Sequence, residues 1–135
     1  MRSLTRRMRF WSRHAATGYC GASAATGNYG ASSATGDSGV SSVTGKCSVS
    51  SVTGFNGASE ARNKESIAVA WGYKSKARGV IGSYLVFADW EGDERNFSNP
   101  DVWELKGAKM VRVDGEEIKE NVWYCIKNGV VVECD

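Results

Sequence analysis

Side chains that could carry out acid–base or nucleophilic chemistry are few in this 135-residue chain. The single histidine, His14, lies in a basic segment near the start, where a surface position is far more common than a general base. Four carboxylates (Asp89, Glu91, Asp93 and Glu94) could pair or hold a cation, but no partner motif accompanies them, and a solvated loop explains them. We therefore predict a protein that is not an enzyme and that uses no metal or cofactor.

The four cysteines do not follow a recognisable disulfide or zinc pattern. No Cys-x-x-Cys pair is present, and Cys20 and Cys47 occupy the same position of a repeat described below. Cys125 and Cys134 fall on one face of an expected hairpin, but diagonally, so a bond between them would require adjustment. We expect reduced thiols, as in the cytoplasm.

Charge is distributed unevenly along the chain. Residues 1–79 hold 11 Lys or Arg against 3 Asp or Glu, a net charge of +8, whereas residues 80–135 hold 6 against 12, a net charge of −6. Positive charge gathers in two clusters: Arg6, Arg7, Arg9 and Arg13, and then Lys74, Lys76 and Arg78, which alternate with small residues and are predicted to share one outward face. Such clusters attract nucleic-acid phosphates or acidic protein surfaces. A solvated basic edge without a ligand, or pairing of the basic half of one chain with the acidic half of another, are the competing interpretations.

A nine-residue repeat must position many of these residues. Thr-Gly recurs at Thr17, Thr26, Thr35, Thr44 and Thr53 within the pattern Ser-x-Ala/Val-Thr-Gly-x-x-Gly-Ala/Val. One such unit, a short strand and a turn, cannot bury a face alone, so copies must stack. Residues 15–79 are therefore predicted to form a narrow parallel β-solenoid with two repeats per coil. A flexible linker is the alternative, since the composition lacks bulk, but the strict phase of Ala and Val argues against it.

Each position of the repeat has an expected role. The small apolar residues at the third place (Ala25, Ala34, Val43, Val52, Ala61) and the last place (Ala22, Ala31, Val40, Val49, Ala58) are predicted to lie inside. Alternation along a strand predicts that Ser32, Ala34 and Gly36 share one face and Ser33 and Thr35 the other, with small residues inward and hydroxyls outward. The glycines at the fifth and eighth places are predicted to supply positive backbone torsions for the turns. Ile67, Trp71 and Tyr73 are predicted to close the open end of the solenoid.

Residues 80–135 are predicted to form a small antiparallel β module, which makes the chain all-β. We expect strands at 84–90, 102–105 and 109–113, a polar loop at 91–100, and a final hairpin of 122–127 and 130–134 around Asn128-Gly129, the preferred sequence of a two-residue turn. Trp90 and Trp103 supply bulk and are candidate binding residues. Residues 1–14 form a basic segment that caps the first coil or is flexible. The sequence shows no secretory signal and no transmembrane run.

Two resemblances follow from these segments. The frames 23–27, 32–36, 41–45 and 75–79 resemble the head repeats of trimeric autotransporter adhesins, which implies a left-handed parallel β-roll that trimerises. The segments 68–79 (AVAWGYKSKARG), 85–91 (LVFADWE) and 111–115 (VRVDG) are similar to uncharacterised proteins of tailed bacteriophages and gut bacteria, which join such nonapeptides to a short C-terminal β module.

Two functional classes remain open on these grounds. The first is a phage-type, non-enzymatic protein-binding or structural module that acts through a rigid rod and its aromatic C-terminal module. The alternative is a small phage-encoded inhibitor that binds a host nucleic-acid-targeting defence complex. The expected partner is a protein, either a second copy or a host complex, with nucleic acid contacted through the basic clusters and no membrane. We expect a location in the host cytoplasm or on the virion.

Overall fold

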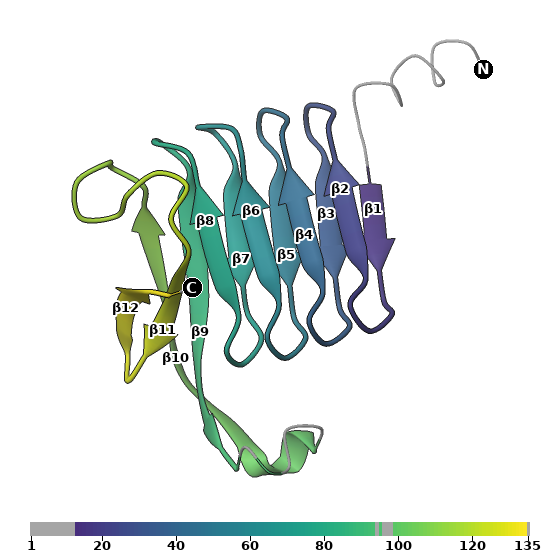
Figure 1. The fold of residues 1–135 in the computed structure, drawn as a ribbon, viewed down its shortest axis with the longest axis vertical. Coiled ribbons are helices and arrows are strands. Elements are labelled where there is room, and N and C mark those ends of the chain that lie inside the picture. Colours follow the sequence, from purple (N-terminus) through teal and green to yellow (C-terminus); the bar gives the residue numbers. More distant parts are fainter. Residues whose placement is uncertain (1–12, 94, 96–98, 135) are drawn as a thin grey trace.

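The structure, a computed structural model, describes residues 13–93, 95 and 99–134 and shows a narrow β-solenoid (Figure 1). Eight four-residue strands wind through four coils: β1 (Arg13–Ala16), β2 (Ala22–Ala25), β3 (Ala31–Ala34), β4 (Val40–Val43), β5 (Val49–Val52), β6 (Ala58–Ala61), β7 (Ile67–Ala70) and β8 (Lys76–Gly79). Equivalent residues of successive coils are 18 positions apart, as in the pairing of Ser32 with Ser50. The predicted all-β solenoid with two repeats per coil is therefore confirmed.

The strands form two six-stranded sheets. Sheet A has the order β1-β3-β5-β7-β9-β10, and sheet B has the order β12-β11-β8-β6-β4-β2. Strand β9 (Tyr84–Gly92) pairs in parallel with β7, so sheet A continues past the last repeat. Strand β10 (Trp103–Arg112) follows the short 3-10 turn η2 (Pro100–Val102) and lies antiparallel to β9, with a bulge between Leu105 and Gly107. The two short strands predicted at 102–105 and 109–113 thus form one long strand.

The final hairpin matches its sequence prediction. Strands β11 (Tyr124–Lys127) and β12 (Val130–Glu133) flank Asn128-Gly129, and Lys127 pairs with Val130. Both turn residues have positive φ, 53° and 78°, as a tight two-residue turn requires. The hairpin joins sheet B where Tyr124 pairs with Ala77 of β8. No helix in the part of the chain that the structure describes is long and apolar enough to span a membrane.

The interior of the solenoid contains serines as well as apolar residues. The first and third residues of each repeat share a face because a strand alternates its side chains. The buried positions are Ser23, Ser32, Ser41, Ser50 and Ser59 beside Ala25, Ala34, Val43, Val52 and Ala61. The last-place residues Ala22, Ala31, Val40 and Val49 face solvent instead. The prediction that Ser32 and Ala34 share one face is therefore confirmed. The prediction that the last-place residues lie inside was wrong for these four, whereas Ala58 is buried.

The buried serines satisfy one another. Ser50 donates a hydrogen bond to Ser41, Ser41 to Ser32 and Ser32 to Ser23, with oxygen–oxygen distances of 2.8 to 2.9 Å, and Ser59 lies 2.8 Å from Ser50. This serine ladder zigzags between the two sheets along the solenoid axis. A buried hydroxyl is costly only when it lacks a partner. Among the described residues, no buried side-chain nitrogen or oxygen lacks one.

The glycines at the fifth place of the repeat permit close stacking of the coils. A Cβ added at Gly36, Gly45, Gly54 or Gly72 would lie 2.0 to 2.2 Å from the carbonyl oxygen of the glycine one coil before. Positive φ occurs instead at the seventh place, with values of 56° to 60° at Cys20, Tyr29, Ser38, Cys47, Asn56 and Lys74. The prediction that the repeat glycines supply the positive torsions was wrong, because steric contact between coils, not turn geometry, requires them.

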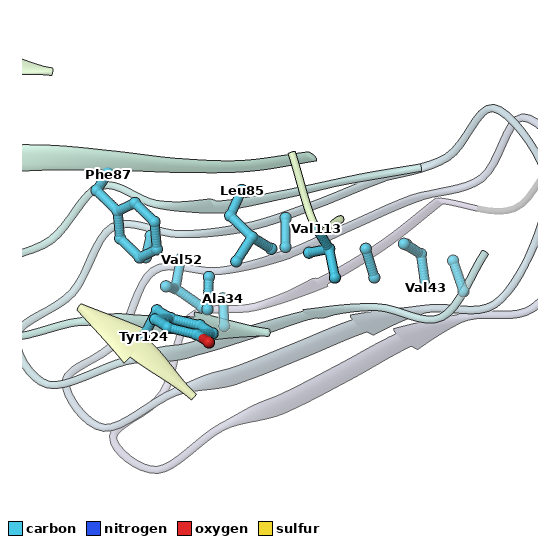
Figure 2. Packing of buried hydrophobic residues seen from close by; sticks show 12 residues of the cluster. Ala34, Val43, Val52, Leu85, Phe87, Val113 and Tyr124 are labelled. Atoms are coloured by element: carbon cyan, nitrogen blue, oxygen red, sulfur yellow. The ribbon is translucent and has the colours of Figure 1, made fainter. Parts of the chain in front are cut away.

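Large side chains close the C-terminal end of the interior. Leu85 and Phe87 of β9, Val113 and Tyr124 are almost fully buried and join the core cluster of small repeat residues (Figure 2). Val113 is held by backbone hydrogen bonds with Gly82 and Ser83, at 2.8 and 2.9 Å. Ile67 lies on the outer face of β7, and Trp71 and Tyr73 lie in the turn that follows. The prediction that these three residues close the end of the solenoid was therefore wrong. The residues buried at that end come from the chain after the repeats.

Candidate binding surfaces

The outer face of sheet A is apolar. Parallel strands in register stack equivalent residues, so two rows of side chains run along the face. One row is Ala31, Val49, Ile67, Tyr84 and Arg112, and the other is Ser33, Ser51, Val69, Val86 and Met110. Val49, Tyr84 and Met110 are 43%, 40% and 64% exposed. Of these residues only Arg112 is charged, and the side chains become larger toward the C-terminal end.

The outer face of sheet B has a different character. Its rows are Ala22, Val40, Ala58 and Lys76, and Ala24, Ser42, Glu60 and Arg78. Trp123 lies against the end of both rows, with its ring centroid 4.8 Å from Lys76 Nζ and 4.4 Å from Arg78 Cζ. Toward the C-terminal end of the rows, sheet A thus carries Ile67, Val69 and Tyr84, whereas sheet B carries the partnered charges Glu60, Lys76 and Arg78.

Glu60 anchors the charged end of the sheet B face. Its carboxylate accepts hydrogen bonds from Arg62 and Arg78, and Ser42 donates to it at 3.3 Å. Burial opposes ionisation of Glu60, but the two guanidinium groups outweigh burial and hold its pKa below the ordinary value. Glu60 is therefore ionised near neutral pH, and the Arg78 charge is partnered within the protein.

The predicted basic cluster at residues 74–78 is split between two surfaces. Lys76 and Arg78 share the outer face of sheet B, as predicted, but both contact Trp123. Lys74 lies in the preceding turn, with Nζ 5.7 Å from the centroid of the Tyr73 ring. Alternation along a strand does not reach Lys74 because β8 begins at Lys76. Arg6, Arg7 and Arg9 lie outside the described residues, as does the side chain of Arg13, whose backbone opens β1.

Both candidate tryptophans come to one edge of the solenoid. We call this the first edge; it consists of the turns at 17–21, 35–39, 53–57 and 71–75, and the β9–β10 hairpin projects past it (Figure 1). The indole Nε1 of Trp90 donates to the carbonyl oxygen of Trp71 at 2.6 Å. Trp103 lies 4.4 Å from Tyr73, centroid to centroid, and Tyr73 lies 5.7 Å from Phe55. The structure therefore assembles a row of aromatic rings from the repeats and the C-terminal module.

A depression of about 400 Å³ lies along this row. We call it the aromatic cleft; Thr35, Asp37, Thr53, Gly54, Phe55, Tyr73, Trp90 and Trp103 line it. Asp37 is fixed in place because its Oδ1 accepts the backbone N–H of Phe55 at 3.0 Å. The cleft combines ring faces with hydroxyl and carboxylate groups, which is the usual composition of a site for a small polar ligand.

A second depression, of about 720 Å³, borders the apolar face of sheet A on the opposite edge. We call it the side hollow; its lining includes Val49, Ile67, Tyr84, Lys64, Glu65 and Arg112. Its apolar residues therefore belong to the outer row of sheet A, and its charged residues lie around them. The apolar face and the side hollow form one continuous surface.

The four cysteines differ in exposure. All four are free thiols; Cys20 and Cys47 are exposed at turn tips, and Cys125 is buried. Burial and the adjoining Cys125 thiol raise the pKa of Cys134 to about 12. The thiolate is the reactive form of cysteine, so Cys134 is unreactive at neutral pH.

Thiol titration of the native protein tests this arrangement. With a chromogenic disulfide reagent at about pH 8, Cys20 and Cys47 are expected to react rapidly, whereas Cys125 and Cys134 react only after the addition of urea. The variant with serine at positions 20 and 47 should lose the fast phase completely. Four equal rates in the native protein would contradict the placement of the C-terminal hairpin.

Sequence reasoning missed three members of the aromatic cleft. Asp37 and Phe55 occupy the variable sixth place of the repeat, at the turn tip, and Tyr73 was assigned to closure of the solenoid end, yet the three lie 18 positions apart and therefore stack at one edge. Comparing turn tips two repeats apart, once two repeats are assigned to each coil, would have found them. Trp90 and Trp103 could be brought to this edge only by the β9–β10 pairing, which the repeat pattern does not contain.

Comparisons with models of known families, with curated proteins and with solved structures found no match to this chain.

Proposed function

We propose that this protein is a non-enzymatic binding module whose docking surface is the outer face of sheet A together with the side hollow. The observation that carries the proposal is the contrast between two faces built from the same repeat. On sheet B, the rows end in ion pairs and a stacked tryptophan that satisfy the charges within the protein. On sheet A, the rows run through Ile67, Val69 and Tyr84, with 40% of Tyr84 exposed to water. They end in Met110, which is 64% exposed, and in Arg112 at the rim. Contiguous exposed apolar surface of this kind is typical of interaction sites.

The combined surface has the composition of a protein interface. Such interfaces have an apolar, often aromatic, centre and a polar rim. Val49, Ile67 and Tyr84 supply the centre, and Lys64 and Arg112 lie at the rim within the side hollow. The solenoid holds Val49, Ile67 and Tyr84 rigidly, because their strands β5, β7 and β9 are each paired on both sides. Binding therefore costs little conformational entropy on this side of the interface.

The size of the face argues for a partner other than a second copy. Four strands of four residues and the longer β9 and β10, of nine and ten residues, lie about 4.8 Å apart with about 3.3 Å per residue and span roughly 550 Å². A stable interface buries about 800 Å² on each partner. Two flat copies placed face to face would bury too little and would leave the side hollow unfilled. A different protein, with an apolar ridge that covers the face and a protrusion that enters the hollow, satisfies both requirements.

A matched pair of charge substitutions tests the proposal. Val49 on β5 and Val40 on β4 are the same residue at the same place of the repeat, 43% and 45% exposed, on opposite sheets. Val49→Glu is expected to weaken partner binding at least about tenfold, because it introduces a charge at the apolar centre. Val40→Glu should leave binding unchanged. The candidate partners are the proteins that bind the wild type and Val40→Glu but not Val49→Glu. Their dissociation constants are then measured with purified components.

Two results would overturn the proposal. If every captured protein is retained by both variants, or lost from both, the sheet A face is not the docking surface. Sedimentation of the purified chain gives the second result: a stable oligomer that Val49→Glu dissociates would show that a second copy occupies the face. Thermal melts of both variants confirm that neither change unfolds the solenoid.

A further inference from the structure

We propose that the aromatic cleft at the first edge is a binding site for a neutral carbohydrate chain. The site is separate from the sheet A face, since its residues come from the turns and from the β9–β10 hairpin. Phe55, Tyr73 and Trp103 form a continuous row with centroid separations of 5.7 and 4.4 Å. The negatively polarised faces of such rings attract the C–H groups on the apolar face of a sugar ring.

The packing of the rings favours a sugar over a flat aromatic ligand. The Phe55 and Tyr73 planes are inclined by 32° and the Tyr73 and Trp103 planes by 44°. Rings at these separations pack against one another, so no nucleobase can be sandwiched between two of them. A chain of sugar rings can instead lie along the row and contact successive rings where they line the cleft.

The polar groups of the cleft favour a ligand that donates hydrogen bonds. Asp37 uses Oδ1 to accept the Phe55 N–H, and a carboxylate carries further lone pairs that accept bonds. The hydroxyls of Thr35 and Thr53, both on exposed residues, can donate or accept. Sugar hydroxyls supply the donors that a carboxylate requires. The described lining includes one carboxylate, Asp37, and the Lys74 ammonium lies 5.7 Å from the Tyr73 ring, so the cleft has no excess of positive charge to select phosphorylated or sulfated chains.

The same polar groups disfavour the main alternative, a proline-rich peptide. Aromatic grooves bind such peptides by packing against the proline rings, but a proline backbone offers carbonyl acceptors and no N–H donors. The Asp37 carboxylate also only accepts, so the two would not pair. The indole N–H of Trp90 could have donated to a peptide carbonyl, but Trp71 already accepts it at 2.6 Å. The Thr35 and Thr53 hydroxyls could donate to a peptide carbonyl, but the Asp37 carboxylate requires a donor, which a carbohydrate supplies and a proline backbone does not.

The structure provides a substitution that changes the cleft without changing the fold. Asn28 occupies the position of Asp37 in a turn of the opposite edge, and its Oδ1 accepts the backbone N–H of Lys46 at 3.0 Å, as Asp37 does for Phe55. Asp37→Asn should therefore preserve the turn while it removes the carboxylate. Asn28→Asp is the matched control, because it creates a carboxylate at an edge with no aromatic row.

Binding is measured with the full-length protein by calorimetry and by tryptophan fluorescence. The probes are neutral hexasaccharides of glucose, of N-acetylglucosamine and of mannose, together with dextran sulfate and a decaproline peptide. We expect one neutral hexasaccharide to bind, Phe55→Ala to abolish binding, and Asp37→Asn to reduce affinity at least about tenfold, with Asn28→Asp unchanged. The proposal fails if none of the neutral sugars binds, if Phe55→Ala and Asp37→Asn bind as the wild type does, or if decaproline or dextran sulfate binds in their place.

Discussion

Replacing Gly54 with alanine is expected to destabilise the protein by about 3 kcal/mol or more, although alanine is only one methyl group larger. The new Cβ would lie 2.2 Å from the carbonyl oxygen of Gly36 in the coil below. Neither group can move aside, because both belong to the backbone and the coils are tied by bonds such as Thr53 N–H to Ala34 O at 3.2 Å. Urea denaturation monitored by circular dichroism measures the loss.

Gly18 provides the control for this substitution within the same molecule. It occupies the same place of the repeat, in the first coil, and a Cβ there would have no atom within 4 Å. Gly18→Ala should therefore be neutral, or stabilising by about 0.5 kcal/mol through a more restricted unfolded chain. Equal destabilisation by both substitutions would mean that these glycines act through backbone torsion and not through contact between the coils.

Replacing Val43 with aspartate is expected to unfold most of the protein at room temperature. Val43 is completely buried between the sheets, beside small apolar residues of the core cluster. The substitution removes a buried apolar side chain and leaves a carboxyl group without a partner, at a combined cost of about 4 kcal/mol or more. That cost approaches the whole stability of a small domain. Loss of the cooperative thermal transition is the expected observation.

Val40, three residues earlier on the same strand, provides the control, because the same substitution is made there at an exposed position. Its side chain faces solvent from β4 and is 45% exposed. Val40→Asp should cost about 1 kcal/mol or less, as expected of a polar substitution on an exposed strand face. A tolerated Val43→Asp, or two variants of equal stability, would contradict the assigned inward and outward faces of the repeat.

The sequence was sufficient for the parts of the fold that repeat or that follow local turn chemistry. A fixed nine-residue period specified stacked strands, and Asn128-Gly129 specified the final hairpin with its register. Residue type alone did not reveal why a glycine is present. Gly54 is required by a backbone 18 positions away, and the positive φ of the turn is adopted by Asn56. Such contacts exist only after coiling, so a local pattern cannot distinguish them from torsional requirements.

The candidate surfaces were only partly predictable for the same reason. Trp90 and Trp103 could be singled out by size, but their neighbours Phe55 and Tyr73 reach them through coil stacking and the β9–β10 pairing. Lys76 and Arg78 were placed correctly on one face by alternation. Their partner Trp123 lies some 45 residues further along the chain and joins them only because the hairpin adds to sheet B. Charge clustering in the sequence therefore overstated how much positive charge is available to a ligand.

The serine ladder and the outer surfaces repeat with different periods, and this difference governs how the array can change in length. The ladder steps from one sheet to the other every nine residues, so removal of one repeat would leave a continuous interior. The outer rows and the turn tips repeat every 18 residues. Loss of a single unit between Asp37 and Phe55 would therefore move Asp37 to the opposite edge and join unlike rows on both faces. An insertion or deletion of one repeat is therefore compatible with folding but disrupts the outer surfaces. A change of two repeats lengthens or shortens the rod by about 4.8 Å and preserves both the serine ladder and the outer surfaces.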